Sequence, residues 1–406
     1  MKYKTNNLLM KNEILNSSNI LFIQDLDGVC IPLVKDPMTR KLKKEYILAA
    51  KLLEKEFFVL TCGEHEGNRG VNRIIERSLE NDIEPKGNGL YLQGLAACGV
   101  EYQDNKGNIS FEGISQKEIN FLSDIPKLMR IKFKSVVKKL FPKMRNEKIN
   151  FHTSISICDT RFSPTVNFNS LFEEVGQDWR KKRNIQKELK KMMDEIIFKA
   201  ESENLKDSFF LHISPNLGTV NHAEIIKESS KNDIGSTDIQ LLLNGAVKDS
   251  GVLCLLNKFI GITKGYKPFG ENFNFRDAPK LIDDKINFCK KYIKHEDMPI
   301  IIGVGDTVTS KKLNENSSYL RGGSDRSFLE FIQLLGKEYN NKNYIIFVDS
   351  SSGEVFRPSV KESGLSGISD NEDILKFDLI FQNGPDEYIN WFREIANERY
   401  LIKNKK

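Results

Sequence analysis

Short apolar runs that end at a polar residue recur along the chain. The first run occupies residues 20–25 and ends at an acid, and the second, residues 57–60, ends at a threonine. Runs of this length, rich in Ile and Phe, are typical of strands buried on both faces. A helix-like segment at 43–55 separates the two runs. The order strand, helix, strand predicts an α/β fold with a doubly wound parallel sheet.

The same pattern of short apolar runs returns in the last third of the chain. Apolar runs at 300–304, 344–348 and 378–381 are interpreted as strands. Further elements are expected as helices at 66–80, 253–260, 326–337 and 385–397 and a hairpin turn at 104–108. Ligands of a doubly wound sheet bind beyond the carboxyl ends of its strands, so the residues that follow each run are the first candidates for chemistry.

The middle of the chain has a different pattern. Two basic, helix-like stretches, 124–145 and 177–200, alternate with strand-like segments at 151–157, 163–168 and 208–213. We interpret residues 111–243 as an inserted α+β cap domain. The catalytic core is then discontinuous and comprises residues 1–110 and 244–406.

Composition narrows the class of protein. Of the 406 residues, 39% are hydrophobic and 29% are charged, and no apolar run approaches the 18 residues that a membrane-spanning helix needs. The first residues lack the apolar core of a secretory signal, so we expect a cytoplasmic protein.

The six cysteines are scattered, without a CxxC pair, and are expected to be free thiols with no disulfide framework and no zinc site.

The net charge is modest and the basic residues are concentrated in the middle of the chain. A net charge of +5 suits a small anionic substrate and is too low to indicate nucleic acid by itself. The stretch 124–145 carries eight Lys or Arg against one acid. Such a helix could touch a membrane surface or a nucleic acid. We favour a cap helix with its basic face in water, and we expect neither a membrane nor a nucleic acid as partner.

The most specific motif is Asp25-Leu26-Asp27-Gly28, directly after the first run. Two acids at i and i+2 of an extended segment point the same way. Converging carboxylates can hold a hard cation such as Mg²⁺. One of them can also act as a nucleophile and the other as a general acid and base. An acidic turn after a strand is the alternative interpretation.

Three further features follow in order along the chain. Thr61 ends the second run, where its hydroxyl could hold a phosphate oxygen. Lys248 stands at the start of a helix, where it could meet an anion. Asp306 follows the run 300–304 and is a partner for Asp25 around a metal. Together these four features would rarely arise by chance.

This ordered set resembles the haloacid dehalogenase (HAD) superfamily of phosphohydrolases, with a cap of the second type (C2), which occurs in sugar-phosphate phosphatases. The resemblance implies that Asp25 is the nucleophile and Asp27 the general acid and base. It implies that Thr61 and Lys248 hold the phosphoryl group. Mg²⁺ would be bound by Asp25, the Asp27 carbonyl and Asp306.

A narrower resemblance is to the glucosylglycerol 3-phosphatase (salt-tolerance phosphatase) family. It rests on the segments around the motifs, namely Gln24–Cys30, Leu33–Pro37, Gly303–Ser310 and Arg321–Arg326. The implied reaction is hydrolysis of 2-O-glucosylglycerol 3-phosphate to the compatible solute glucosylglycerol, an osmoprotectant made under salt stress. The implied partner is the glucosylglycerol-phosphate synthase that makes the precursor.

Other functions stay open on the residues alone. The same chemistry fits another sugar phosphate, such as sucrose 6-phosphate or glucosylglycerate phosphate. A catalytically silent relative that acts as a binding module, for example on RNA through the basic helices, is a different class. The presence of all five motif residues argues against silence.

Several residues are candidates for binding the substrate or completing the metal site. Many HAD members carry an acid where this chain has Ser310, and Asp325 is a candidate to supply the missing carboxylate. Candidate substrate contacts are Gly63, Glu64, His65, Arg161, Asn216 and His222. His212 alternates with apolar neighbours in a strand-like segment and is as easily a core or a surface residue.

Overall fold

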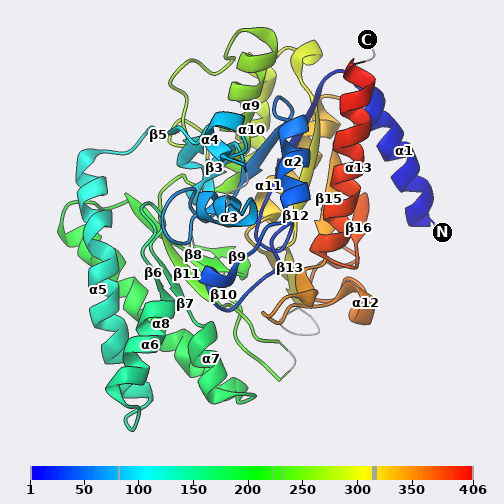
Figure 1. Ribbon diagram of the computed structural model, residues 1–406. Helices are drawn as coiled ribbons and strands as arrows, with labels where there is room; N and C mark the ends of the chain where they lie inside the picture. Colours follow the sequence, from blue (N-terminus) through cyan, green and yellow to red (C-terminus); the bar gives the residue numbers. More distant parts are fainter. Residues whose placement is uncertain (1, 81–82, 222, 232, 313–317, 405–406) are drawn as a thin grey trace.

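The computed structural model describes residues 2–80, 83–221, 223–231, 233–312 and 318–404 (Figure 1). The helices are α1 (Lys2–Asn16), α2 (Lys44–Leu52), α3 (Val71–Ser78), α4 (Pro85–Asn88), α5 (Gln116–Leu140), α6 (Asn146–Ser156), α7 (Asn169–Val175), α8 (Trp179–Ser202), α9 (Lys248–Lys264), α10 (Ile282–Tyr292), α11 (Arg326–Glu338), α12 (Val360–Ser363) and α13 (Pro385–Asn404). The strands are β1 (Ile20–Gln24), β2 (Phe57–Leu60), β3 (Gly94–Ala96), β4 (Glu101–Gln103), β5 (Ile109–Phe111), β6 (Ile157–Cys158), β7 (Thr165–Asn167), β8 (Phe209–Ser214), β9 (Asn216–Val220), β10 (Ala223–Ile226), β11 (Asp238–Leu243), β12 (Ile300–Gly305), β13 (Thr309–Lys312), β14 (Tyr319–Gly322), β15 (Tyr344–Val348) and β16 (Leu379–Phe381).

The larger sheet has the strand order β16-β15-β12-β1-β2-β3-β4-β5. Its strands from β16 to β3 are parallel to their neighbours, and β3, β4 and β5 form an antiparallel edge. The chain adds β2 on one side of β1 and later adds β12 on the other. The strand order therefore reverses at β1, where a doubly wound sheet opens a crevice for ligands.

Both faces of this sheet are covered by helices. On β1, Phe22 points to the face covered by α1, α2, α3 and α13, whereas Ile23 points to the face covered by α9, α10 and α11. Burial on both faces explains why these strands read as unbroken apolar runs. The expected doubly wound α/β fold is confirmed.

The second sheet has four antiparallel strands in the order β6-β7-β11-β8. One face of it packs on α5 and α8, which lie on the outer side of the molecule (Figure 1). The buried stripe of α5, which includes Phe121, Ile125, Met129 and Phe133, belongs to this core. The other face of the sheet is turned towards the larger sheet.

One predicted element in this region is wrong. Residues 151–157 read as a strand, but residues up to Ser156 belong to helix α6. The buried residues of α6 are Ile149, His152, Thr153 and Ser156, at the i, i+3, i+4 and i+7 spacing of a helix face. Because several residues of this buried face are polar, the helical period was not visible in the pattern of hydrophobic residues.

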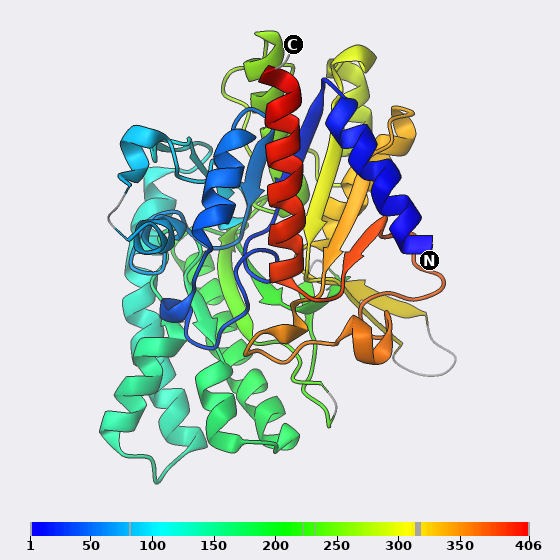
Figure 2. The ribbon, with the colours of Figure 1, turned by 45° about the vertical axis from the view of Figure 1, so that its right-hand side comes forward.

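The two ends of the chain are brought together on one face of the larger sheet. Helix α1, which the apolar pattern did not reveal, packs beside α13 (Figure 2). Arg399 of α13 is fully buried, and its Nε donates to Glu56 Oε2 over 2.7 Å. None of the helices in the described ranges has the length and hydropathy needed to cross a bilayer.

Candidate active site

The acids predicted from the motifs meet at the carboxyl ends of neighbouring strands. Asp25 follows β1 and Asp306 follows β12, and the Asp25 amide donates to the Val304 carbonyl over 3.0 Å. Asp325 precedes α11 and lies beside them. One carboxylate oxygen of each of these three residues lies within 4.8 Å of the others. The three side chains are buried, at 6%, 5% and 0% exposure respectively.

Lys248 links two of these carboxylates. Its Nζ lies 2.7 Å from Asp25 Oδ2 and 2.6 Å from Asp325 Oδ1. Lys248 is the first residue of α9 and is itself buried. Burial raises the pKa of Asp25 to about 7, and the charge of Lys248 opposes this rise. The pKa of Lys248 is raised by the two carboxylates, so the lysine is a fixed positive charge at the site.

The carboxylate cluster fits a hard cation. Asp306 Oδ2 is buried and, among the described residues, has no hydrogen-bond partner. Burial and the neighbouring Asp325 raise the pKa of Asp306, because both disfavour the charged carboxylate. Mg²⁺ prefers oxygen ligands and is usually held by one or two carboxylates together with water and substrate phosphate, which this cluster can provide for.

The motif glycine leaves room for this cluster. Gly28 has φ of +85°, and a Cβ built on it would lie 2.1 Å from Asp306 Oδ2. Any side chain here would collide with the acid that the cluster needs.

Asp325 takes the place expected for the second acid. Its Oδ2 accepts hydrogen bonds from the amides of Asp306 and Thr307, each over 2.9 Å. Ser310, at the usual acid position, instead donates its hydroxyl to Asp370 in a contact away from the cluster. The structure thus brings Asp325 into the cluster and leaves Ser310 out.

Asp27 lies at the edge of the cluster and pairs with an arginine that the sequence did not indicate. Arg40 Nη1 lies 2.9 Å from Asp27 Oδ2. The same guanidinium donates to the backbone carbonyl of Arg69. Arg69 in turn contacts Asp159, which follows β6 of the second sheet, with 2.8 Å between Arg69 Nη1 and Asp159 Oδ1. A continuous chain of contacts therefore joins Asp27 to residues of the insertion.

Thr61 directly follows β2 and lines the same cavity as Asp27. Its Oγ1 accepts from the Gly63 amide over 3.1 Å, and its backbone carbonyl accepts from the Cys98 amide over 3.0 Å. Cys62 and Cys98 form a disulfide. The expectation of free thiols was therefore wrong for this pair, because Cys62 and Cys98, which are distant in sequence, follow the neighbouring strands β2 and β3.

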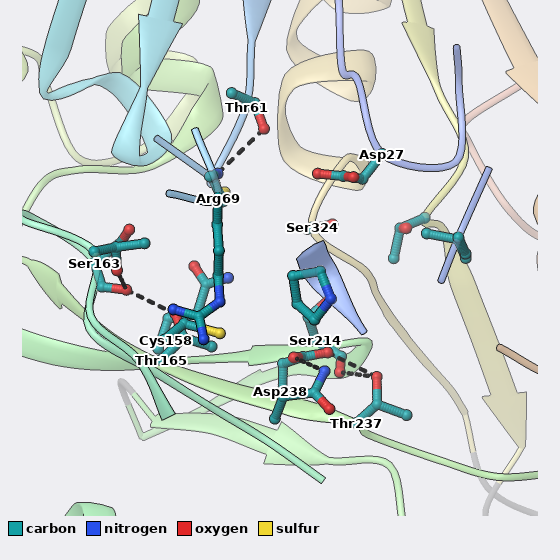
Figure 3. Close-up of a pocket in the computed structure, with 18 of the residues that line it drawn as sticks. Asp27, Thr61, Arg69, Cys158, Ser163, Thr165, Ser214, Thr237, Asp238 and Ser324 are labelled. Carbon is teal, nitrogen blue, oxygen red and sulfur yellow. Dashed lines mark hydrogen bonds between the residues drawn. The ribbon is translucent and has the colours of Figure 1, made fainter. Parts of the chain in front are cut away.

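A cavity of about 190 Å³ lies between the two sheets, and four of the five motif residues line it, whereas Asp306 is not among its lining residues. Figure 3 shows Asp27 and Thr61 on the core side of this cavity, and Thr165, Ser214 and Asp238 facing them from the insertion. Asp25 and Lys248 also line it. The motifs and the insertion thus share one cavity.

Gly63 and Glu64 line the cavity as expected, whereas His65 does not. Burial raises the pKa of Glu64 to about 7. His65 is fully buried, with Nε2 placed 3.2 Å from the Gly94 carbonyl, and burial lowers its pKa to about 4. His65 is therefore a core residue that supports the loop after Thr61.

The candidates from the insertion are placed elsewhere. The Arg161 guanidinium stacks over the ring of Phe111, 4.5 Å from its centroid, outside the lining of the cavity. Asn216 is buried, and its Oδ1 accepts from the amides of Gly218 and Gly323, which joins the insertion to the core. His222 lies outside the described residues.

Most of the insertion residues that line the cavity were not predicted as site residues. Cys158, Thr160, Ser163, Asn169 and Thr237 are among them. Six more lie on β7, β8 and β11, namely Thr165, Asn167, His212, Ser214, Asp238 and Gln240. In each strand a polar residue, an apolar residue and a second polar residue follow one another. This alternation with a period of two was the available signal, and each segment is too short for it to be decisive. Arg357, in a loop after β15, also lines the cavity and had no signal.

Comparison with known proteins decides the family. The family described as glucosylglycerol-phosphate phosphatase (Salt_tol_Pase) matches residues 19–396. A curated protein from Synechocystis sp., named glucosylglycerol-phosphate phosphatase, is 38% identical over 398 residues, which cover 95% of this chain and 94% of that protein. The chain belongs to the glucosylglycerol-phosphate phosphatase family. The narrower of the two resemblances is thereby confirmed, and the chain is a phosphatase by family.

Solved structures give a weaker likeness. The C-terminal domain of C. albicans trehalose-6-phosphate phosphatase has a TM-score of 0.48 at 13% identity, with 97% of each chain covered. A trehalose-6-phosphate phosphatase related protein has a TM-score of 0.44 at 12% identity, with coverage of 95% of this chain and 100% of that chain. At these scores the likeness says nothing about the substrate of this glucosylglycerol-phosphate phosphatase family member.

Proposed function

We propose that this protein hydrolyses 2-O-glucosylglycerol 3-phosphate to glucosylglycerol and phosphate, with Mg²⁺ and through an aspartyl-phosphate. The observation that supports the chemistry is the buried Lys248, held between Asp25 and Asp325 in the cluster that includes Asp306, whose Oδ2 has no partner in the part of the chain that the structure describes. Membership of the family supports the substrate. A fixed cation beside a strand-end carboxylate is suited to an incoming phosphate ester.

The reaction has two steps at phosphorus. In the first, an Asp25 oxygen forms a bond to phosphorus while the bond to the glycerol oxygen breaks, and Asp27 gives that oxygen its proton. In the second, Asp27 takes a proton from water, whose oxygen attacks phosphorus and releases Asp25. Lys248 and the Thr61 hydroxyl hold the oxygens of the phosphoryl group during both steps.

Mg²⁺ fits the carboxylate cluster. Asp25, Asp306 and the Asp27 carbonyl would hold it, and Asp325 lies within reach of the same position. When bound, the cation would offset negative charge on the phosphoryl oxygens.

Residues 111–243 act, in this proposal, as the cap over a core made of residues 1–110 and 244–406. Thr165, Ser214 and Asp238 of the second sheet face Asp27 and Thr61 across the cavity (Figure 3), which supports this role. A cap in this position would exclude water from the aspartyl-phosphate and select the alcohol part of the substrate. The association with the synthase and the cytoplasmic location stay predictions.

The test is phosphate release from the purified protein on a panel of four esters: glucosylglycerol 3-phosphate, sucrose 6-phosphate, trehalose 6-phosphate and glycerol 3-phosphate. We expect preference for the first ester, with Mg²⁺ required and EDTA abolishing release. Asp25→Asn should lose turnover, and Asp386→Asn, an exposed acid on α13, should keep it. Preference for sucrose or trehalose 6-phosphate would overturn the substrate. Release from none of the esters would favour a silent binding module.

A further inference from the structure

The face of the cap sheet that meets the cavity carries a regular array of polar side chains. In the strand register, Asp238 is the partner of Asn167 and Ser214, and Gln240 is the partner of Thr165 and His212. The array therefore has two rows of three residues, one centred on Asp238 and one on Gln240. All six side chains line the cavity.

The opposite face of the same strands is apolar. Between the two polar rows lie Val166, Ile239 and Ile213, which are in register with one another and 0% exposed. Successive side chains of a strand point to opposite faces, so the polar rows are fixed towards the cavity by burial of the apolar row. The fold therefore determines the direction in which these six polar side chains point.

Hydrogen-bonding atoms on this face lack partners. Among the described residues, Gln240 Oε1, His212 Nε2 and the nearby Ser163 hydroxyl are buried without one. Buried polar atoms almost always have a partner in the functioning protein, and leaving one unpaired is costly. Two of these atoms are acceptors on neighbouring residues of one row.

Glu224 fixes the orientation of His212. Its Oε1 lies 2.9 Å from His212 Nδ1, and its Oε2 accepts from the Ile213 amide over 2.7 Å and from Asn216 Nδ2 over 2.8 Å. A carboxylate at Nδ1 keeps a proton on that nitrogen, so in the ring with a single proton Nε2 presents a lone pair.

The array contains one acid, Asp238, and no lysine or arginine, and its only ring is the imidazole of His212. Asp238 accepts from Asn167 Nδ2 over 2.7 Å and from the Thr237 hydroxyl over 2.8 Å, and burial raises its pKa. The cations of the cavity, Lys248, Arg40, Arg69 and Arg357, come from the core. Within the described lining, His212 is the only aromatic side chain. A neutral group with several hydroxyl donors fits this face, whereas a second phosphate would meet an acid and no cation there.

We infer that the row Thr165–Gln240–His212 of the cap sheet determines specificity by accepting hydrogen bonds from hydroxyls of the sugar part of the substrate, with Glu224 as the positioning residue of His212. This inference rests on the proposed function and deepens it. It names the contacts that distinguish a glycosylated phosphate ester from a simple one.

The experiment compares two substrates that share the phosphate chemistry. One is glucosylglycerol 3-phosphate, and the other is p-nitrophenyl phosphate, which has no hydroxyl on its leaving group. Gln240→Met and His212→Phe preserve approximate side-chain size and remove the acceptors. We expect kcat/KM for the sugar phosphate to fall about tenfold or more in each variant, mainly through KM. Turnover of p-nitrophenyl phosphate should stay within about twofold, which also shows that the variant is folded.

Two further variants separate specificity from structure. Gln116→Leu removes an exposed glutamine amide at the start of α5 and should change neither substrate. Glu224→Gln should raise KM for the sugar phosphate alone and shift the ¹⁵N resonances of the His212 ring. Parallel losses on both substrates, or an unchanged KM for the sugar phosphate, would overturn the inference.

Calorimetry with free glucosylglycerol separates this inference from the proposed function. The neutral product should bind the wild-type protein and bind Gln240→Met about tenfold more weakly or not at all. Binding without hydrolysis of any ester would overturn the function and keep the subsite. Hydrolysis with equal product binding by both proteins would keep the function and overturn the subsite.

Discussion

At the scale of single residues, Gly28 decides whether the carboxylate cluster can form. Gly28→Ala would put a Cβ 2.1 Å from Asp306 Oδ2 at φ of +85°. We expect a loss of phosphatase activity of about 100-fold or more and a higher Mg²⁺ requirement, measured by titrating Mg²⁺ in the phosphate-release assay. Gly364→Ala is the matched control, because Gly364 has φ of +60° with nothing within 4 Å of its Cβ position. Equal activity of the two variants would contradict this role of Gly28.

His65 should make stability depend on pH. Burial lowers its pKa from 6.5 to about 4, so between these values the unfolded state binds a proton that the folded state does not. The full contribution of His65 to the free energy of unfolding is present above about pH 6.5. It is lost as the pH falls to about 4, and the total loss is about 3 kcal/mol. Denaturant unfolding of wild type and His65→Gln across this range should show a shallower slope in the variant. His295→Gln, at an exposed histidine, should keep the wild-type slope.

The chemistry of the site was predictable where it follows buried strands. Asp25, Thr61 and Asp306 each stand at the end of an apolar run, so the position of these runs in the sequence located them. Arg40 and Arg357 lie in loops, and their position depends on tertiary contacts that no local pattern encodes. Asp325 was found only because Ser310 stood in the usual acid position.

At the scale of elements, the joint between β14 and β9 depends on close backbone contact. Gly322 of β14 lies against β9 of the insertion, and its Cβ would meet the Gly218 amide nitrogen at 2.1 Å. Gly322→Ala should lower the melting temperature by several degrees, measured by scanning calorimetry, because backbone on both sides must move. Gly261→Ala, within α9, would meet only the flexible Lys267 side chain and should leave the melting temperature near that of wild type. A similar drop in both variants would argue against a tight joint.

Elements were predictable from the sequence to the extent that they were apolar. The strands β1, β2, β12 and β15 match their apolar runs because they are buried on both faces. Helix α6 was mistaken for a strand because half of its buried face is polar. Helix α1 was missed because its packing against α13 is not visible in the local pattern.

At the scale of the whole molecule, one buried ion pair joins the two ends of the chain to the sheet. Arg399 of α13 contacts Glu56 just before β2, and it also donates to the Ile14 carbonyl of α1. Arg399→Met leaves the buried Glu56 with less compensation and should lower the free energy of unfolding by about 3 kcal/mol or more in a urea titration. Arg393→Met, at an exposed arginine of the same helix, should change it by less than about 0.5 kcal/mol. Equal stability of the two variants would show that the ion pair is not needed.

The central claim is that Asp25 becomes phosphorylated during turnover. The most direct measurement is to quench the protein during hydrolysis of glucosylglycerol 3-phosphate with Mg²⁺, reduce it with borohydride, and map its peptides by mass spectrometry. Borohydride converts an aspartyl-phosphate to homoserine. The account predicts homoserine at position 25 of the wild-type protein, and none at Asp27. The Asp25→Asn variant should give no homoserine. Rapid turnover with Asp25 unmodified, or with the label on another acid, would contradict it.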